Sequence, residues 1–355
     1  MLTRLTIVLL TLGGALAIAA ASVKSAAPDP ARQVTIVRHD DAKRIDVLVG
    51  GKPFTSYIYP ASTRKPVLYP LRSAKGTIVT RGYPLEPRAG ERADHMHHVG
   101  FWFTHGDLNG IDFWGYSDET PAKEIPTKGT IQHRAVTRSE NGDGRGELAI
   151  TADWVMPDGS TILTEETRFT FRAAADSRVV DRITRWTARD KKIAFGDTKE
   201  GSFGLRVARS LEQPSKEAEI FTDASGQKTT VPKLDNTGVT GLYRSSEGQT
   251  GDAVWGTRGR WLMLTGTVDR EPVTLAIVDH PKNPGAPTYW HARGYGLFTA
   301  NPFGQHAFDS KQPTRTVVLE PRQSMMFRHR LLILSGTATP QRIDEEFKAF
   351  ERIPE

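Results

Sequence analysis

The sequence predicts an all-β protein built as an antiparallel β-sandwich, with one short helix at the C-terminus. Short runs of alternating apolar residues recur along the chain, and turn residues separate them at short intervals. In one such run Ile45, Val47 and Val49 alternate with other residues, and Gly50-Gly51 then closes a predicted hairpin with the segment 54–59. This close spacing favours antiparallel strands over β–α–β units.

The remaining strands are predicted from the same pattern. We expect them at 77–81, 97–104, 147–155, 161–172, 177–188, 261–267, 273–279 and 324–333.

One segment has the pattern of a helix. Thr339 is a suitable N-cap and Pro340 would occupy the first helical position. Ile343, Phe347 and Phe350 then fall on one face, at helical spacing. The pattern predicts a helix that packs against the sandwich.

Residues 1–21 are predicted to be a signal peptide. Arg4 precedes an uncharged apolar run from 5 to 21 that ends in small residues. A membrane anchor is the alternative, but the Thr, Gly and Ala content makes the run weakly apolar for a span. We expect a flexible lead-in at 22–32, a single sandwich domain at 33–355, and a periplasmic or secreted protein with no membrane contact after leader cleavage.

Composition excludes several kinds of chemistry. The chain has no cysteine, which rules out disulfides, thiolate nucleophiles, Cys-ligated zinc and Fe–S clusters. Its 47 basic residues are interleaved with 41 acidic ones, for a net charge of +6. Because no basic run stands out, we expect a solvated basic surface and no nucleic-acid partner.

Histidines are densest between 94 and 114, where His95, His97, His98 and His105 lie within eleven residues. A strand at 97–104 would place His97 on one apolar face and His98 on the other. Imidazoles held at the mouth of a covered strand suit acid–base work.

Three interpretations of this segment stay open. The imidazoles could act as acid and base on a sugar, with Trp102 or Trp114 as a stacking face. They could instead bind a metal through His95, His97 and a carboxylate such as Asp107, although the spacing matches no standard zinc motif. They could also be structural histidines bonded to backbone carbonyls.

Two further segments contain polar groups suited to a ligand. At 196–206, Glu200 follows Lys199 in a glycine-bounded turn, and Lys199 is expected to keep Glu200 ionised. At 279–304, Trp290, Arg293 and Asn301 lie among prolines and glycines, as the aromatic and forked polar groups of carbohydrate sites do. Neither a G-x-S-x-G elbow nor a phosphate-binding glycine loop occurs.

The segments 97–114, 197–201 and 290–304, with 69–71 and 80–84 upstream, resemble the bacterial family labelled "methane oxygenase PmoA". The resemblance spans nearly the whole mature chain. It implies a galactose-mutarotase-like supersandwich and a sugar-related role. The family has Arg after its paired histidines, where this chain has Val99. The positions that match the family motifs are His97, His98, His105, Asp107, Asn109, Lys199, Glu200, Arg206, Trp290, Arg293 and Asn301.

These observations lead to the hypothesis of a periplasmic carbohydrate-active enzyme, a hydrolase, lyase or epimerase, with a small carbohydrate or glycoside as ligand. His98 and Glu200 are the expected acid–base pair, and neither a metal nor a cofactor is expected. The alternatives are a sugar-binding module that depends on residues 289–295 and a metal-dependent oxygenase. The residues expected to bind substrate are His97, His105, Asp107, Asn109, Trp114, Lys199, Arg206, His280, Trp290, Arg293 and Asn301.

Overall fold

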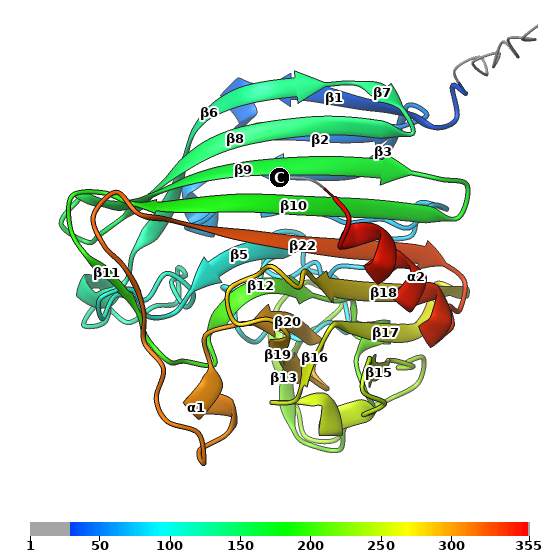
Figure 1. Ribbon diagram of the computed structural model, residues 1–355. Coiled ribbons are helices and arrows are strands. Elements are labelled where there is room, and N and C mark those ends of the chain that lie inside the picture. Colours follow the sequence, from blue (N-terminus) through cyan, green and yellow to red (C-terminus); the bar gives the residue numbers. More distant parts are fainter. Residues whose placement is uncertain (1–28, 354–355) are drawn as a thin grey trace, which may run out of the picture.

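The computed structural model describes residues 29–353, and within them two large antiparallel sheets pack face to face (Figure 1). The antiparallel β-sandwich predicted from the sequence is therefore confirmed. The predicted signal peptide and residues 22–28 of the predicted lead-in lie outside the described residues, so these predictions and the single-domain boundary stay predictions.

One sheet carries the candidate site. In spatial order its strands are β16 (Arg258–Gly259), β19 (Thr288–Arg293), β20 (Leu297–Asn301), β12 (Gly201–Arg206), β5 (Phe101–His105), β4 (Val67–Leu68), β3 (Lys52–Ile58), β2 (Arg44–Val49), β1 (Gln33–His39) and β7 (Gly142–Asp143).

The second sheet covers the first. In spatial order its strands are β15 (Leu242–Ser245), β17 (Trp261–Val268), β18 (Glu271–Asp279), β22 (Ser324–Ser335), β10 (Ser177–Ala188), β9 (Thr161–Ala173), β8 (Arg145–Val155) and β6 (Thr130–Glu140).

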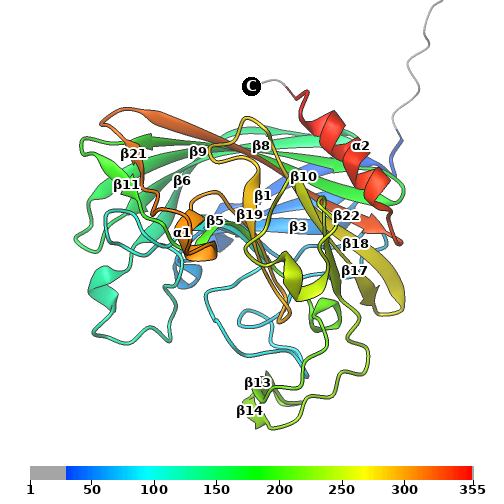
Figure 2. The ribbon, with the colours of Figure 1, turned by 60° about the horizontal axis from the view of Figure 1, so that its bottom comes forward.

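Smaller elements lie outside the two large sheets. Two short antiparallel pairs of strands are separate from them. One joins β11 (Ile193–Phe195) to β21 (Val317–Leu319), and the other joins β13 (Glu219–Thr222) to β14 (Lys228–Val231). Figure 2 shows β13 and β14 projecting from the body of the protein. Short 3₁₀ helices lie at Asp40–Ala42, Ala61–Thr63, Ile125–Thr127, Arg209–Leu211 and Gly251–Val254, and a four-residue helix α1 at Gln305–Phe308.

Aromatic side chains fill the space between the sheets. The ring of Phe103 on β5 lies 4.6 Å from that of Trp186 on β10, and Phe203 on β12 stacks on His329 of β22 at 4.4 Å. One cluster of buried residues contains side chains from both sheets. Burial of this apolar surface is the main force that holds the sheets together.

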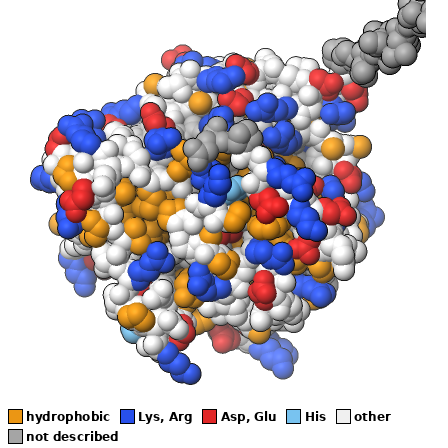
Figure 3. Space-filling view, in the orientation of Figure 1, with side chains coloured by type: hydrophobic (Ala, Val, Ile, Leu, Met, Phe, Trp, Pro, Cys, Tyr) orange, Lys and Arg blue, Asp and Glu red, His pale blue; other side chains and the backbone are white. Residues whose placement is uncertain are grey.

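The predicted C-terminal helix is confirmed as α2 (Pro340–Phe350), with Thr339 as its N-cap. Its buried face, Ile343, Phe347 and Phe350, packs on the outer surface of the eight-stranded sheet, where it crosses β22 and β18 (Figure 1). On the face shown in Figure 3, acidic and basic side chains are interspersed.

Most of the predicted strands form, but two predictions need correction. The hairpin at Gly50-Gly51 and the strands near 147–155, 161–172, 177–188, 261–267, 273–279 and 324–333 are present as β2–β3, β8, β9, β10, β17, β18 and β22. The segment 77–81 forms only isolated bridges, Arg72 with Ile78 and Thr80 with Val207. The strand expected at 97–104 begins only at Phe101.

Candidate functional site

A cleft of about 810 Å³ opens beside the ten-stranded sheet. Residues from five stretches of chain line it, within 92–98, 112–115, 199–200, 213–219 and 291–295, together with Lys128 and Asp252. These stretches come from the loop before β5, the loop after it, the turn before β12, the loop after β12 and the end of β19. The three sequence segments proposed for chemistry thus each contribute residues to one cleft.

The histidines at the mouth of the cleft lie in a turn and not in a strand. The amide of His98 donates to the carbonyl of His95 at 2.9 Å, and His95 itself has φ of 41°. Gly100, with φ of 54°, ends the turn, and a Cβ there would lie 2.4 Å from the carbonyl oxygen of Leu68. Because only glycine fits at this position, the strand starts after it.

Strand alternation then separates His105 from the other histidines. Phe103 and His105 have the same parity in β5, and the His105 ring lies 4.8 Å from Phe303 and 5.7 Å from Phe195, both core residues. Trp102 has the opposite parity and packs with Trp114 in a second buried cluster, separate from the one between the sheets. His105 therefore supports the interior, and its predicted role in substrate binding is not supported by its position.

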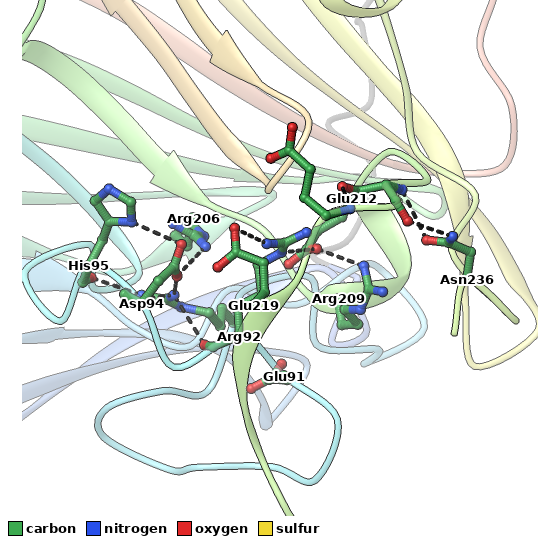
Figure 4. Close-up of polar contacts among 12 residues, drawn as sticks. Glu91, Arg92, Asp94, His95, Arg206, Arg209, Glu212, Glu219 and Asn236 are labelled. Atoms are coloured by element: carbon green, nitrogen blue, oxygen red, sulfur yellow. Dashed lines mark hydrogen bonds and ion pairs between the residues drawn. The ribbon is translucent and has the colours of Figure 1, made fainter. Parts of the chain in front are cut away.

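A buried ionic network lies beneath the histidine turn. Oδ1 of Asp94 accepts hydrogen bonds from Arg81 Nη1 and Arg206 Nη2, both at 2.6 Å, and Oδ2 lies 2.9 Å from His95 Nδ1 (Figure 4). Burial tends to raise the pKa of Asp94, but Arg206, His95 and Arg81 together hold that pKa well below its usual range. Arg81 also donates to the carbonyl oxygen of His98, at 3.1 Å. The network fixes the shape of the turn.

Four parallel rings form a stack that runs from the sheet to the cleft. In order they are Trp102, His98, His95 and Tyr295, with centroid separations of 5.2, 4.8 and 5.2 Å. Gly204 on β12 makes room for the first ring, because a Cβ there would lie 2.6 Å from the Trp102 indole. The stack ends in His95 and Tyr295, two rings that line the cleft.

His98 occupies the inner part of this stack. Its Nδ1 lies 3.3 Å from Nη1 of Arg206, which can only donate, so Nδ1 must be the acceptor and the proton sits on Nε2. The Nε2 atom is buried without a partner in the described part of the chain. Burial, His97 and Arg206 lower the pKa of His98 well below its usual value. A buried, guanidinium-bound imidazole is poorly placed to exchange protons with a substrate.

His97 is the least constrained imidazole of the turn. Its ring lies edge-on to His98, with centroids 4.4 Å apart, and makes no hydrogen bond with any residue in 29–353. It is half-buried and lines the cleft. Burial first, then the charges of Lys65 and His95, lower the pKa of His97 well below its usual value. His97 is therefore a neutral imidazole that faces the cleft.

Backbone contacts on both sides fix the turn that carries Glu200. Asn301 Nδ2 donates to the carbonyl of Thr198 at 2.8 Å, and the amide of Gly106 donates to the carbonyl of Glu200 at 2.6 Å. Lys199 Nζ lies 3.7 Å from Glu200 Oε1. Burial raises the pKa of Glu200 despite the opposing charge of Lys199. Lys199 favours the ionised form of Glu200, as expected, but desolvation has the larger effect on the pKa.

The end of β19 forms the adjacent wall. Alternation in this strand directs His291 and Arg293 to the cleft, while Trp290 is fully buried in the core between the sheets. His291 Nδ1 donates to the carbonyl of Lys199 at 2.8 Å, which leaves Nε2 as an acceptor. Burial lowers the pKa of His291 to about 3. The sugar-binding module based on residues 289–295 loses its main ring, because Trp290 faces inward.

Some of the other predicted binding residues support the cleft from outside its lining, and some lie away from it. Arg206 holds Asp94, and Asn301 holds the turn that carries Glu200. Trp114 lines the cleft but is only 1% exposed, and Trp102 is fully buried, so neither offers a free stacking face. Of the predicted site residues, His97, His98, Trp114, Lys199, Glu200 and Arg293 line the cleft, whereas His105, Asp107, Asn109, Arg206, His280, Trp290 and Asn301 do not.

Asp107, Asn109 and His280 have structural partners. Asp107 Oδ1 accepts from the amide of Gly110, and Asn109 bonds to both Lys192 and Ala194, so these side chains hold a loop. His280 lies beneath α2, with its ring 5.3 Å from that of Phe350. All three residues lie within segments that the sequence analysis singled out, but their side chains do not line the cleft.

Several cleft residues were not among the predicted site residues. His291 and Tyr295 flank the predicted Arg293, and a strand assignment over 288–293 would have placed His291 on the same face as Arg293. Arg81 lies in the segment 80–84 that carries part of the resemblance, but its role was not predicted, because it acts on the cleft through Asp94. No motif identified the segment after β12 that contains Gln213, Ser215, Glu217 and, at the start of β13, Glu219.

Within residues 29–353 no group of three or more His, Asp or Glu side chains could hold a metal ion. The proposed ligand set His95, His97 and Asp107 is thus not assembled. Among the same residues no helix is both long and apolar enough to span a membrane.

Comparison with known proteins gives structural neighbours at low identity. The chain is similar to a putative aldose 1-epimerase from Klebsiella pneumoniae subsp. pneumoniae, with 10% identity, a TM-score of 0.38, and coverage of 87% of this chain and 83% of that chain. For the galactose 1-epimerase from Lactobacillus acidophilus the identity is 10%, the TM-score 0.35 and the coverage 86% and 98%.

A third similar structure is the GH36 α-galactosidase from Geobacillus stearothermophilus, with 10% identity, a TM-score of 0.38, and coverage of 85% of this chain and 40% of that chain. The chain thus spans about two fifths of the length of that enzyme. No curated protein matches the chain.

A family model matches residues 44–348, which is most of the chain and includes every segment of the cleft. The matching model does not carry the "methane oxygenase PmoA" label of the family that the sequence motifs resemble. The chain belongs to the family of unknown function DUF6807.

Proposed function

We propose that the protein is a carbohydrate-active enzyme that transfers protons to and from a sugar or glycoside bound in the cleft. One observation carries this proposal. His97 and Glu200 line the same cleft, and their surroundings shift their pKa values in opposite directions, down for the imidazole and up for the carboxyl group. Groups with pKa values shifted by burial and neighbouring charges, gathered in one cleft, are typical of acid–base sites in enzymes.

The directions of the two shifts assign the roles. His97, neutral because of burial and nearby cations, accepts a proton from a sugar hydroxyl or carbon. Glu200, whose pKa burial raises, donates a proton to a sugar oxygen. Reversal of both transfers restores the starting state, so no external acid or base is consumed.

This pairing favours isomerisation or elimination over direct displacement at the anomeric carbon. Displacement of the common kind uses two carboxyl groups across the glycosidic bond. Two other carboxylates of the cleft are already paired. Asp94 accepts hydrogen bonds from Arg81 and Arg206, and Asp112 accepts one from Lys128 at 2.8 Å. They are therefore committed to structure, whereas the imidazole of His97 is free.

We assign the predicted catalytic residue His98 a positioning role in this scheme. It lies between Trp102 and His95 and holds the ring stack, so that His95 and Tyr295 present ring surface to the cleft. Aromatic faces suit the apolar face of a sugar ring.

The test is a turnover screen with the mature full chain. Anomerisation is followed by polarimetry, epimerisation by chromatography and elimination by ultraviolet absorbance, over free sugars, uronates and their glycosides. His97→Gln and Glu200→Gln should each lower turnover by roughly 10²–10⁴-fold. His306→Gln, an exposed histidine outside the cleft, is the matched control and should keep full activity. Turnover that survives both cleft substitutions would overturn the proposal.

We also propose export to the periplasm or beyond, on the strength of the apolar run 5–21 and its small-residue end. Sequencing the N-terminus of the protein made in a bacterial host tests this. A mature start near residue 22 supports export, whereas retention of Met1 on a cytoplasmic product contradicts it.

A further inference from the structure

Two cations of the cleft lack the close carboxylate partner that the others have. Arg92 Nε lies 2.7 Å from Glu212 Oε2 (Figure 4), and Lys128 Nζ lies 2.8 Å from Asp112 Oδ2. By contrast, the Arg293 guanidinium makes no hydrogen bond or ion pair with any side chain or backbone group in 29–353. Lys199 Nζ lies 3.7 Å from Glu200 Oε1, beyond hydrogen-bond distance.

Arg293 is held in place without using its donors. Its guanidinium carbon lies 4.8 Å from the centroid of the Trp255 ring, in a cation–π contact. Such a contact engages the guanidinium through the ring quadrupole and leaves its N–H groups unpaired. An exposed guanidinium with free donors is a receptor for a carboxylate, which it can bind through two parallel hydrogen bonds.

Lys199 and Arg293 lie on the same wall. Both flank His291, whose Nδ1 donates to the backbone of Lys199 and whose strand ends at Arg293. After burial, the charges of Arg293 and Lys199 are the next effects that lower the pKa of His291. Glu200 follows Lys199 directly, so this cationic wall adjoins the proposed acid.

The rest of the cleft limits the charge of the anion. Glu217, Glu219 and Asp252 also line it, and acidic lining residues outnumber basic ones. A dianion such as a phosphate monoester would be repelled by these groups more strongly than a singly charged carboxylate.

We propose that the sugar carries a carboxylate, as in a uronic acid or a uronate residue of a glycan, and that Arg293 and Lys199 bind it. This inference rests on the proposed function and names its substrate class. The carboxylate would lie on the cationic wall, and the sugar ring beside Glu200 and the His95 and Tyr295 rings.

The test is calorimetric binding of D-glucuronate and D-galacturonate against D-glucose and D-galactose, with the mature full chain at low salt. Wild type should prefer each uronate over its neutral parent by roughly tenfold or more, and the preference should shrink with added salt. Arg293→Gln should abolish the preference while the affinity for the neutral sugar stays the same. Arg293→Lys should retain only part of it.

Arg38→Gln is the matched control, since it removes one positive charge from the exposed end of β1, at the far side of the same sheet. It should leave the preference intact. Equal affinity of wild type for uronates and neutral sugars, or a preference that survives Arg293→Gln, would overturn the inference. Neutral-sugar turnover that depends on His97 and Glu200 would then still support the proposed function. Uronate preference with no turnover of any sugar, uronate or glycoside would refute the proposed function alone.

Discussion

Arg206 Nη2 donates a hydrogen bond of 2.6 Å to Oδ1 of Asp94 beneath the floor of the cleft. The Arg206 side chain is fully buried and that of Asp94 is 16% exposed. Because Arg81 donates to the same oxygen, one carboxylate neutralises two buried guanidinium groups and holds the histidine turn over them. The shape of the candidate site therefore depends on an ion network that lies largely beneath the cleft.

Removal of that one charge should destabilise the whole protein. Asp94→Asn keeps the shape of the side chain but leaves Arg81 and Arg206 without a counter-charge, which we expect to cost about 3–5 kcal/mol of unfolding free energy. Urea denaturation measures it. Asp118→Asn, which breaks the more exposed pair with Arg64, should cost less than about 1 kcal/mol. Equal losses in the two variants would contradict the role of the network.

The glycine that ends the histidine turn should not tolerate a side chain. Gly100→Ala adds a Cβ about 2.4 Å from the Leu68 carbonyl oxygen in addition to the strain of positive φ. Gly76 also has positive φ, but a Cβ there meets nothing within 4 Å. We expect Gly100→Ala to destabilise the protein by roughly 1–3 kcal/mol more than Gly76→Ala, measured by thermal or urea unfolding. Similar losses would show that the close approach is unimportant.

Buried neutral histidines should make the fold sensitive to acid. Burial lowers the pKa of His105 to about 4, while the unfolded chain binds the proton near the ordinary value of 6.5. Unfolding then takes up a proton, so the stabilising contribution is complete above pH 6.5 and is lost as pH falls toward 4. Urea midpoints across this range should decline less steeply for His105→Gln than for wild type. Equal slopes for His105→Gln and wild type would contradict this account.

The C-terminal helix should depend on its cap. Thr339→Ala removes the hydroxyl that accepts from the Arg342 amide at 3.3 Å, and we expect a loss of about 1 kcal/mol. The exposed neighbour Thr337, which lies outside α2, is the control, and Thr337→Ala should have little effect. A loss as large for Thr337→Ala would show that the cap contributes nothing.

Local patterns predicted the long hairpin strands and the helix well, because alternation and capping are local. The strands near 161–172 and 177–188 alternate over many residues, and Thr339-Pro340 marks a helix start. Short strands such as β11, β16 and β21 have too few residues to show a period. The strand predicted at 97–104 started too early, because the conformation at Gly100 is set by contact with the Leu68 carbonyl. That carbonyl is distant in sequence but close in space.

The cleft was predicted in part. Motifs identified the segments of His97, Glu200 and Arg293, and all three side chains line it. Parity in the sheet then decided which neighbours face the cleft: His105 and Trp290 turn to the core, whereas His291 turns to the cleft. The roles of Arg81 and Asp94 could not be seen in sequence, because their contact joins separate loops.

The pH dependence of kcat/KM on the best substrate tests acid–base catalysis by His97 and Glu200 most directly. His97 must be neutral and Glu200 protonated, so activity should rise as His97 deprotonates below pH 6.5 and fall as Glu200 deprotonates above pH 4.5. The residual activity of His97→Gln should lack the acidic limb, and that of Glu200→Gln the alkaline limb. A profile with both limbs unchanged in both variants would contradict the assignment.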